Sequence, residues 1–376
     1  MGKNLARTLS NLQKIVIKIG SSCITSPSGR LDRPQMARLA REISELKKRG
    51  HEIIIVSSGA IAAGVESLDL KKRPGEIPRL QAAAAVGQGL LMHMYSTLFS
   101  QQGIRVGQIL LTQEDTTRRQ QYINARNTIS TLLKFGVIPI INENDSVAVE
   151  EIKFGDNDTL AALVSSLANA DLLIILSDIE GLCSTDPYLC DHPEIISEVE
   201  EISPEIEEIA GGAGSGRSRG GMVTKIQAAR IATFSSIGVI IADGRKEGIL
   251  QEILAGKEVG TYFKPRKEKV ASLKRWIAFG RQCKGKIIID AGAVKAIRED
   301  GRSLLPVGIL QVEGEFESGD NVDLIDGEGK LVARGVTNFS HQEVRRIAGL
   351  RSEEIIRKYG RDYGSEVVHR DLMVVF

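Results

Sequence analysis

The chain has 376 residues, of which 42% are hydrophobic and 26% charged, a composition typical of a globular protein with two or three domains. Its 49 basic and 48 acidic side chains nearly balance, so no overall charge excess points to a nucleic-acid or membrane partner. The four cysteines form no CxxC pair, and we find neither a signal peptide nor a run of about 20 apolar residues; we therefore expect a cytoplasmic protein with reduced thiols and no membrane contact.

Short apolar strands alternate with helical patterns through about residue 265. KIVIKI (14–19) and EIIIVS (52–57) are strand-like, and apolar residues recur at helical spacing from Met36 to Leu46 between them. Further helices, each followed by a strand, are expected over about 80–102, near 122–134, after Asp158 and over about 221–236. Apolar strands separated by helices predict an α/β fold with a mainly parallel central sheet in an αβα sandwich.

Polar residues gather where these strands end, and the carboxyl ends of parallel strands are where such sheets bind ligands. They are Gly20–Ser22, Ser57–Gly59, Asn142–Asp145 and Ser177–Asp178. Lys18 followed by Gly20 and Ser21 suits a phosphate, because glycine lets backbone N–H groups approach it closely. An ordinary turn beside a snorkelling lysine remains the alternative. Close backbone packing is the simpler explanation of the small residues after Ser58.

Residues 211–225 contain six glycines and run into a helical pattern. A loop of this kind at a helix start is typical of a phosphate cradle, with Lys225 one turn inside the helix; a plain surface loop is the alternative. The segment is neither a Walker A loop nor a GxGxxG fingerprint. In Asp156-Asn157-Asp158, the other positions of a calcium loop are missing. We expect Asp158 to cap the following helix and to hold lysine charges in place.

The composition changes near residue 264. Residues 264–281 carry seven basic side chains and one acidic side chain, and the segments after Lys284 are short and strand-like, with a hairpin signal at 326–330. The sequence therefore predicts a first domain over 1–265, a basic linker over 266–283 and a small β-rich domain over 284–376. The last region has 14 basic and 16 acidic side chains.

Several of these segments occur in the order seen in a known family. KIGSS, VSSGAIAAG, AAVGQ, INENDSVAVEEIKFGDND, SDIEGL and GGMVTK together resemble the glutamate kinases of the amino acid kinase superfamily. IIIDAGAVKAI, SLLPVGILQVEGEFESGDNV and ARGVTNFS resemble a PUA domain. The resemblance covers essentially the whole chain. It implies transfer of a phosphoryl group from ATP, with Mg²⁺ carried on ATP, to the γ-carboxylate of L-glutamate in proline biosynthesis.

The resemblance also assigns roles to residues. It implies that Lys18 and Lys225 bind the transferring phosphoryl group and that Asp158 orients them. Its ATP-binding positions are Lys18, Gly20, Ser21, Ser177, Asp178, Arg219, Gly220, Gly221, Met222, Val223, Thr224 and Lys225. Its glutamate-binding positions are Ser58, Gly59, Asn142, Asp145, Asp156 and Asn157. No protein metal ligand is implied. A homo-oligomer (dimer or tetramer) and feedback inhibition by proline through the 145–157 loop are implied as well.

Other functions remain open at this point. Another kinase of the superfamily would act on aspartate, N-acetylglutamate, a nucleoside monophosphate or carbamate. N-acetylglutamate lacks the ammonium group that Asp145 would pair with, and aspartate kinases usually carry ACT-type domains. An RNA-binding protein is the alternative from another class, because PUA domains are common there. The slight acidic excess of 284–376 argues against RNA binding, although the basic linker favours it.

Overall fold

The computed structural model describes residues 12–112, 115, 119–147, 157–184, 194–211, 219–266, 283–351, 354–355, 357 and 366–376. Two compact units divide the chain, Met1–Lys269 and Val270–Phe376. The expected basic linker lies almost entirely outside the described residues. So do Asp156, residues 212–218 of the glycine-rich segment and most of the 145–157 loop.

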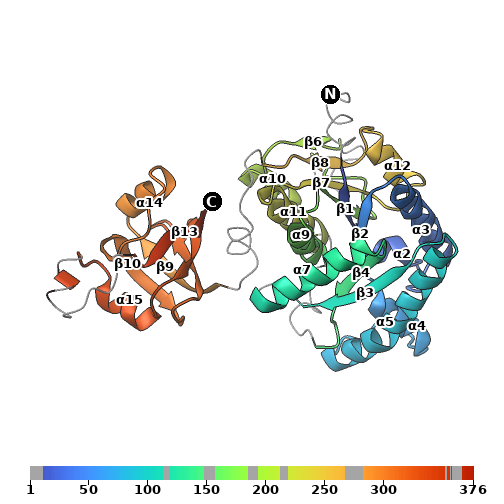
Figure 1. Cartoon of the computed structure of the whole chain (residues 1–376), viewed down its shortest axis with the longest axis horizontal. Helices are drawn as coiled ribbons and strands as arrows, with labels where there is room; N and C mark the ends of the chain where they lie inside the picture. The colour runs from blue at the N-terminus through green and yellow to red at the C-terminus, as the bar shows by residue number, and fades with distance from the viewer. Residues whose placement is uncertain are drawn as a thin grey trace. The chain divides into compact units, whose positions relative to one another are not determined.

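An eight-stranded sheet with the order β3-β4-β2-β1-β5-β7-β8-β6 forms the centre of the first unit (Figure 1). Neighbouring strands are parallel except for β8, which runs antiparallel to β7. The prediction of a mainly parallel sheet is therefore confirmed. The strands span β1 (Lys14–Ile19), β2 (Glu52–Ser57), β3 (Val106–Leu111), β4 (Ile138–Glu143), β5 (Leu172–Ser177), β6 (Glu198–Val199), β7 (Gly238–Asp243) and β8 (Thr261–Phe263).

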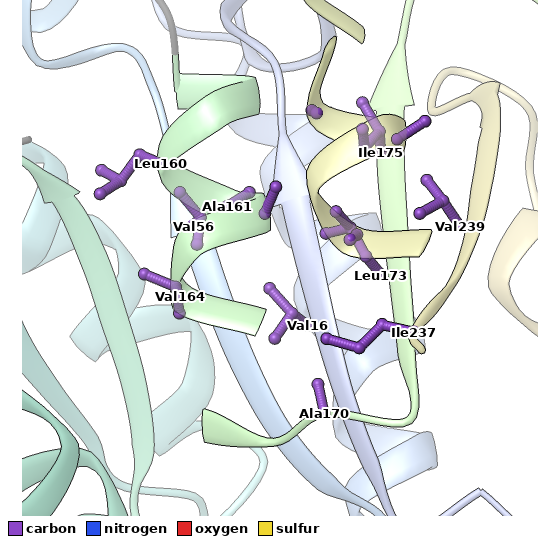
Figure 2. Packing of buried hydrophobic residues seen from close by; sticks show 14 of the residues in the cluster. Val16, Val56, Leu160, Ala161, Val164, Ala170, Leu173, Ile175, Ile237 and Val239 are labelled. Atoms are coloured by element: carbon purple, nitrogen blue, oxygen red, sulfur yellow. The ribbon is translucent and has the colours of Figure 1, made fainter. Parts of the chain in front are cut away.

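Helices cover both faces of this sheet. Alternate residues of a strand point to opposite faces, so Ile15, Ile17 and Ile19 pack with α3, α5 and α12, whereas Val16 packs with α7, α9 and α11. Figure 2 shows the second of these cores, which contains Val16, Val56 and Ala161. The αβα sandwich is thus confirmed. The helices span α2 (Ser21–Ile24), α3 (Arg33–Lys48), α4 (Ala60–Ser67), α5 (Ile77–Ser100), α7 (Arg119–Lys134), α9 (Asn157–Ala168), α10 (Pro204–Gly211), α11 (Arg219–Phe234) and α12 (Ile249–Leu254).

Two of these helices begin earlier than the hydrophobic period indicated. α5 begins at Ile77 rather than near 80, because Pro78 is well suited to the first turn, where its missing N–H costs no helical bond. α11 begins at Arg219 rather than Gly221, so the glycine pair lies inside the helix. Apolar periodicity starts only where a helix meets the core and therefore misses an exposed first turn.

The second unit contains a five-stranded sheet with the order β10-β9-β11-β12-β13, which confirms the expected β-rich region (Figure 1). Only the β9–β11 pair is parallel. The hairpin predicted at 326–330 joins β11 to β12, where Asp326 Oδ1 accepts the N–H groups of Glu328 and Lys330. Its elements are β9 (Cys283–Ile289), α14 (Ala291–Arg298), η1 (Pro306–Gly308), β10 (Ile309–Gly314), β11 (Asn321–Ile325), β12 (Leu331–Thr337), α15 (His341–Ile347) and β13 (Val368–Val375). No helix in the described ranges is long and apolar enough to cross a membrane.

Candidate active site

The candidate site lies at the carboxyl ends of five adjacent strands of the first unit. The order β4-β2-β1-β5-β7 places the ends of β4 and β2 on one side of β1 and the ends of β5 and β7 on the other. Backbone bonds tie these ends together: Gly20 N donates to Leu176 O at 3.0 Å, and Ser58 N donates to Ile19 O at 3.2 Å. The predicted clusters of polar residues therefore form one row along a single edge of the sheet.

Two lysines share one carboxylate in the middle of this row. Lys18 has the same strand parity as Val16, so its side chain leaves β1 toward α9 and α11. Its Nζ lies 2.5 Å from Asp158 Oδ1, and Lys225 Nζ lies 3.2 Å from Asp158 Oδ2. Thr224 Oγ1 also donates to Asp158 Oδ2 at 2.9 Å. The sheet and two helices thus bring together the three residues expected to be catalytic.

All three charged groups are buried, with exposures of 6% for Lys18, 4% for Asp158 and 6% for Lys225. Burial alone would raise the pKa of Asp158, but the charges of Lys18 and Lys225, with hydrogen bonds from Lys18 and Thr224, outweigh it and lower that pKa. Asp158 therefore stays ionised at neutral pH. One carboxylate between two ammonium groups leaves a net positive charge, which suits a phosphoryl group.

Two details of this cluster differ from the sequence prediction. Asp158 is the second residue of α9, which begins at Asn157, so the prediction of an N-cap was wrong: its carboxylate is directed at the two lysines instead. Lys225 lies nearly two turns inside α11 rather than one. Its side chain reaches back toward the helix start, where Nζ donates to Gly221 O at 3.0 Å.

The side-chain amides of Asn157, Asn142 and Gln88 form a hydrogen-bonded chain. Asn157 Nδ2 is within hydrogen-bond distance of Ser57 O, Ser58 Oγ and Asn142 Oδ1, at 3.1, 2.8 and 3.1 Å. Asn142 Nδ2 in turn donates to Gln88 Oε1 at 2.8 Å. These partners fix the direction of each amide. Asn157 Oδ1 is consequently a buried acceptor without a hydrogen-bond partner among the described residues.

A cavity of about 700 Å³ opens beside these amides. This volume is within the range of small-molecule sites. Five residues expected to bind the amino acid line it: Ser58, Gly59, Asn142, Asp145 and Asn157. Ser21, expected on the nucleotide side, lines it as well. Because Asn157 and Asp158 are consecutive, the cavity and the lysine pair meet at the first turn of α9.

Close packing of α4 against α5 holds the turn that carries Ser58. A Cβ on Gly64 would lie 1.8 Å from Ala83 O, and one on Gly87 would lie 1.9 Å from Ala60 O, so both positions require glycine. Gly59 has φ +105°, a conformation that other residues rarely adopt. The small residues after Ser58 therefore serve packing, as the simpler explanation held, while Ser58 itself faces the cavity.

The ends of β1 and β5 form the other side of the row. Asp178 Oδ1 accepts from Ser22 Oγ at 3.0 Å and from Ser177 Oγ at 3.1 Å. Burial would raise the pKa of Asp178, but a backbone hydrogen bond, the two hydroxyls and the charge of Arg245 lower it. A Cβ on Gly20 would lie 3.1 Å from Leu176 O, so a larger residue would crowd this turn.

The remaining nucleotide-side positions, Arg219–Thr224, form the first turns of α11, directly before Lys225. Sequence reasoning missed two residues in the row. Gln88 ends the AAVGQ motif and bonds Asn142; Arg245 follows β7 and donates to Ser22 O at 3.1 Å. The position of Arg245 just past a strand end was the available signal. In the described ranges, no three His, Cys, Asp or Glu side chains form a group that would hold a metal ion.

Two family models match this chain. Residues 13–243 match the model of the amino acid kinase family, and residues 285–359 match that of the PUA domain. Proteins named glutamate 5-kinase from Syntrophotalea carbinolica and Moorella thermoacetica are each 48% identical to this chain; the matches cover 98% of this chain and 98% and 97% of the respective relatives.

Among solved structures, carbamate kinase from Giardia lamblia bound to AMP-PNP covers 68% of this chain and 100% of its own length, with a TM-score of 0.50 and 18% identity. This likeness concerns the fold alone. A family match over more than half of the chain, together with relatives 48% identical over nearly all of it, has one meaning: the chain belongs to the amino acid kinase family.

Proposed function

We propose that this protein transfers the γ-phosphoryl group of ATP to the γ-carboxylate of L-glutamate, giving γ-glutamyl phosphate and ADP, as the first step of proline biosynthesis. One observation carries the proposal: Asp158 joins two buried lysines at a point where the preceding residue, Asn157, borders a polar cavity large enough for an amino acid. Relatives 48% identical over nearly the whole chain are named for this activity, which supports the same choice.

The reaction needs positive charge more than it needs a base. A γ-carboxylate oxygen of glutamate attacks the γ-phosphorus, and the bond to the bridging oxygen breaks as ADP leaves. The attacking carboxylate is already ionised at neutral pH, since the ordinary pKa of such a group is about 4.3, so no proton has to be removed. Lys18 and Lys225 stabilise the charge on the transferring group, and Asp158 keeps both ammonium groups in place.

The cavity supplies partners for the charged groups of a free amino acid. Asp145 lines it with a carboxylate that suits the substrate ammonium, and the buried Asn157 Oδ1 offers a second acceptor. Ser58 and the neighbouring amides bind the α-carboxylate. Asp156, which the resemblance also assigns to glutamate binding, lies outside the described residues. This assignment favours glutamate over N-acetylglutamate, which has no ammonium group for Asp145.

ATP would lie on the β5 side of Lys18, against Gly20, Ser177, Asp178 and the first turns of α11. Mg²⁺ carried on ATP would supply further positive charge at the phosphates. Oxygen is the ligand atom that Mg²⁺ prefers, and the Asp178 carboxylate and Ser177 hydroxyl offer oxygens here. The chain's own residues then bind and orient the phosphates.

The test is to trap the product. The protein is incubated with ATP, Mg²⁺ and L-glutamate, and hydroxylamine is added to convert an acyl phosphate into γ-glutamyl hydroxamate. L-aspartate and N-acetyl-L-glutamate are run in parallel. Hydroxamate from glutamate alone supports the proposal. Hydroxamate from L-aspartate or N-acetyl-L-glutamate, with none from glutamate, would show that glutamate is not the substrate.

Several properties extend the proposal beyond the reaction. We include a cytoplasmic location, a dimer or tetramer, and inhibition by proline acting through the 145–157 loop. We also keep the division into a kinase domain over 1–265, a basic linker over 266–283 and a PUA domain over 284–376. Size-exclusion chromatography with light scattering tests the oligomer. A proline titration at several glutamate concentrations tests the inhibition.

RNA binding stays outside the proposal. The PUA match favours it, but the region 284–376 has 14 basic and 16 acidic side chains, and RNA binding without a positive surface is weak. Filter binding with tRNA at two salt concentrations distinguishes the alternatives. Tight binding that weakens as salt rises would reinstate an RNA partner.

A further inference from the structure

The turn after β7 carries a cation that the mechanism above does not use. Asp243 ends β7, and Arg245 follows two residues later. Since β7 lies next to β5 and β5 next to β1, this turn is adjacent to Asp178 and to the Gly20–Ser22 turn. Gly244 N donates to Ser177 O at 2.8 Å, which fastens the turn to the end of β5.

The Arg245 side chain joins these strand ends. Its Nη2 donates to Ser22 O at 3.1 Å, while the hydroxyl of the same serine donates to Asp178 Oδ1 at 3.0 Å. Asp243 Oδ1 accepts the backbone N–H of Arg245 at 2.8 Å, which sets the direction in which the chain leaves the strand. The guanidinium is therefore held beside the turn expected to receive the phosphates, and the residue is otherwise exposed to solvent.

A buried network behind the turn keeps it in place. Arg38 donates to Lys246 O at 2.8 Å and also to Gly244 O, and it pairs with Glu42. Glu42, only 6% exposed, accepts the N–H of Gly248 at 3.0 Å. Ion pairs of this kind are weak evidence for stability, because desolvation costs offset the attraction. What the network does achieve is to hold the Gly244–Gly248 backbone, and with it Arg245, in one geometry.

Packing leaves this turn little freedom. A Cβ on Gly244 would lie 2.7 Å from Cys23 Sγ and 2.9 Å from Leu176 Cβ. The turn is thus pressed against the end of β5 and against α2, which follows the Gly20 turn. Arg245 is presented by a rigid backbone rather than by a mobile loop, which lowers the entropy lost when it binds a ligand.

The charges on this side of the row indicate what the cation is for. Lys18 and Lys225 share Asp158, and Asp178 and Asp243 add two more carboxylates at the ends of the neighbouring strands β5 and β7. These five groups sum to one negative charge, although the expected ligand is a polyanion. Adding Arg245 neutralises the set before any Mg²⁺ arrives. A guanidinium fits phosphate oxygens with two parallel N–H groups.

We propose that Arg245 is a further nucleotide-binding residue, which contacts the β-phosphate that stays on ADP when the γ-phosphoryl group is transferred. This inference rests on the proposed function for the direction of transfer. Lys18 and Lys225 then serve the moving group, while Arg245 holds the leaving group. Arg38 acts as a positioning residue, because it reaches the nucleotide only through the backbone that carries Arg245.

Isothermal titration calorimetry with ADP and with AMP, at fixed Mg²⁺ and without glutamate, tests the inference. Arg245→Gln should raise the Kd for ADP by about tenfold or more, the usual range for lost hydrogen bonds to a charged group. The Kd for AMP, which has no β-phosphate, should stay within twofold. Lys246→Gln makes the same charge change at the next residue, whose side chain pairs with Glu252, and should leave both values unchanged.

Two outcomes would overturn the inference: an unchanged ADP affinity in Arg245→Gln, or equal weakening of ADP and AMP, which would indicate only local disruption. Should Arg245→Gln fold poorly, Arg245→Lys keeps the charge and loses the bidentate fork, and a severalfold selective loss of ADP affinity is expected. If the wild-type protein makes no hydroxamate from glutamate, but Arg245→Gln still weakens ADP binding selectively, the proposed substrate is wrong and the role of Arg245 stands.

Discussion

Replacing Asp158 by Asn tests the centre of the candidate site most directly. The substitution keeps the size and shape of the side chain, removes its charge and replaces one of its two acceptor oxygens by an NH₂ donor. Lys18 and Lys225, each 6% exposed, would then face each other without the carboxylate that lies 2.5 and 3.2 Å from their Nζ atoms. Removing one partner of a buried ion pair leaves an uncompensated charge and typically costs about 3–5 kcal/mol, on the order of a third of a domain's stability.

The pH dependence of stability should change as well. The pKa of Asp158 is lowered in the folded state, so its contribution is fully present above the unfolded value of about 3.9 and is lost as the pH falls through the folded pKa. Wild-type stability should therefore decline as the pH falls below about 4, in part through this group. Asp158→Asn should lack that part of the decline.

The free energy of unfolding is measured by urea titration followed by far-UV circular dichroism. Glu207→Gln is the matched control: it removes the same charge from an exposed pair with Arg230 in the same unit and should cost less than about 1 kcal/mol. Hydrogen exchange with mass spectrometry locates the loss, which should affect β1, α9 and α11 and spare β9–β13. Phosphoryl transfer should fall about 100-fold or more. A variant within about 1 kcal/mol of wild type would refute the electrostatic account of this cluster.

Three other predictions follow from the cavity and its supports. Asp145→Ala should raise the KM for glutamate more than tenfold and that for ATP less than twofold; an unchanged glutamate KM would contradict the ammonium assignment. Gln88→Leu removes the acceptor for the Asn142 amide and should raise the glutamate KM severalfold at unchanged ATP affinity, as steady-state kinetics would show. Gly64→Ala should destabilise the fold by about 1–3 kcal/mol, because its Cβ meets the Ala83 backbone, whereas Gly89→Ala, in the same helix pair and with open space, should stabilise it by up to about 1 kcal/mol in thermal unfolding.

Much of the site was predictable because it depends on strand ends. An apolar strand followed by polar residues marks the carboxyl edge of a parallel sheet, and this pattern placed Gly20–Ser22, Ser57–Gly59, Asn142–Asp145 and Ser177–Asp178 at that edge. The spacing of the apolar residues also predicted that helices cover both faces of the sheet. These signals are local in sequence, since each depends on a strand and the few residues that follow it.

Contacts that depend on side-chain direction were not predictable in the same way. Gln88 lies in the middle of α5, where helical periodicity gives no reason to place it beside Asn142. Arg245 follows a strand end in the sequence, but only the structure shows that its turn is fixed against β5. Asp158 was expected both to cap α9 and to hold lysine charges, and the structure shows only the second of these contacts. Lys18 and Lys225 come from distant segments and each pairs with a different oxygen of its carboxylate.

The first turn of α9 explains how the two halves of the site work together. Consecutive residues of a helix point about 100° apart. Asn157 can therefore border the cavity through bonds to β2 and β4, while Asp158 faces the lysines of β1 and α11. Both side chains belong to one helical turn, so the same stretch of backbone fixes the residue that borders the cavity and the residue that holds the two lysines. The substrate side and the phosphoryl side of the candidate site are therefore joined through the backbone of residues 157 and 158.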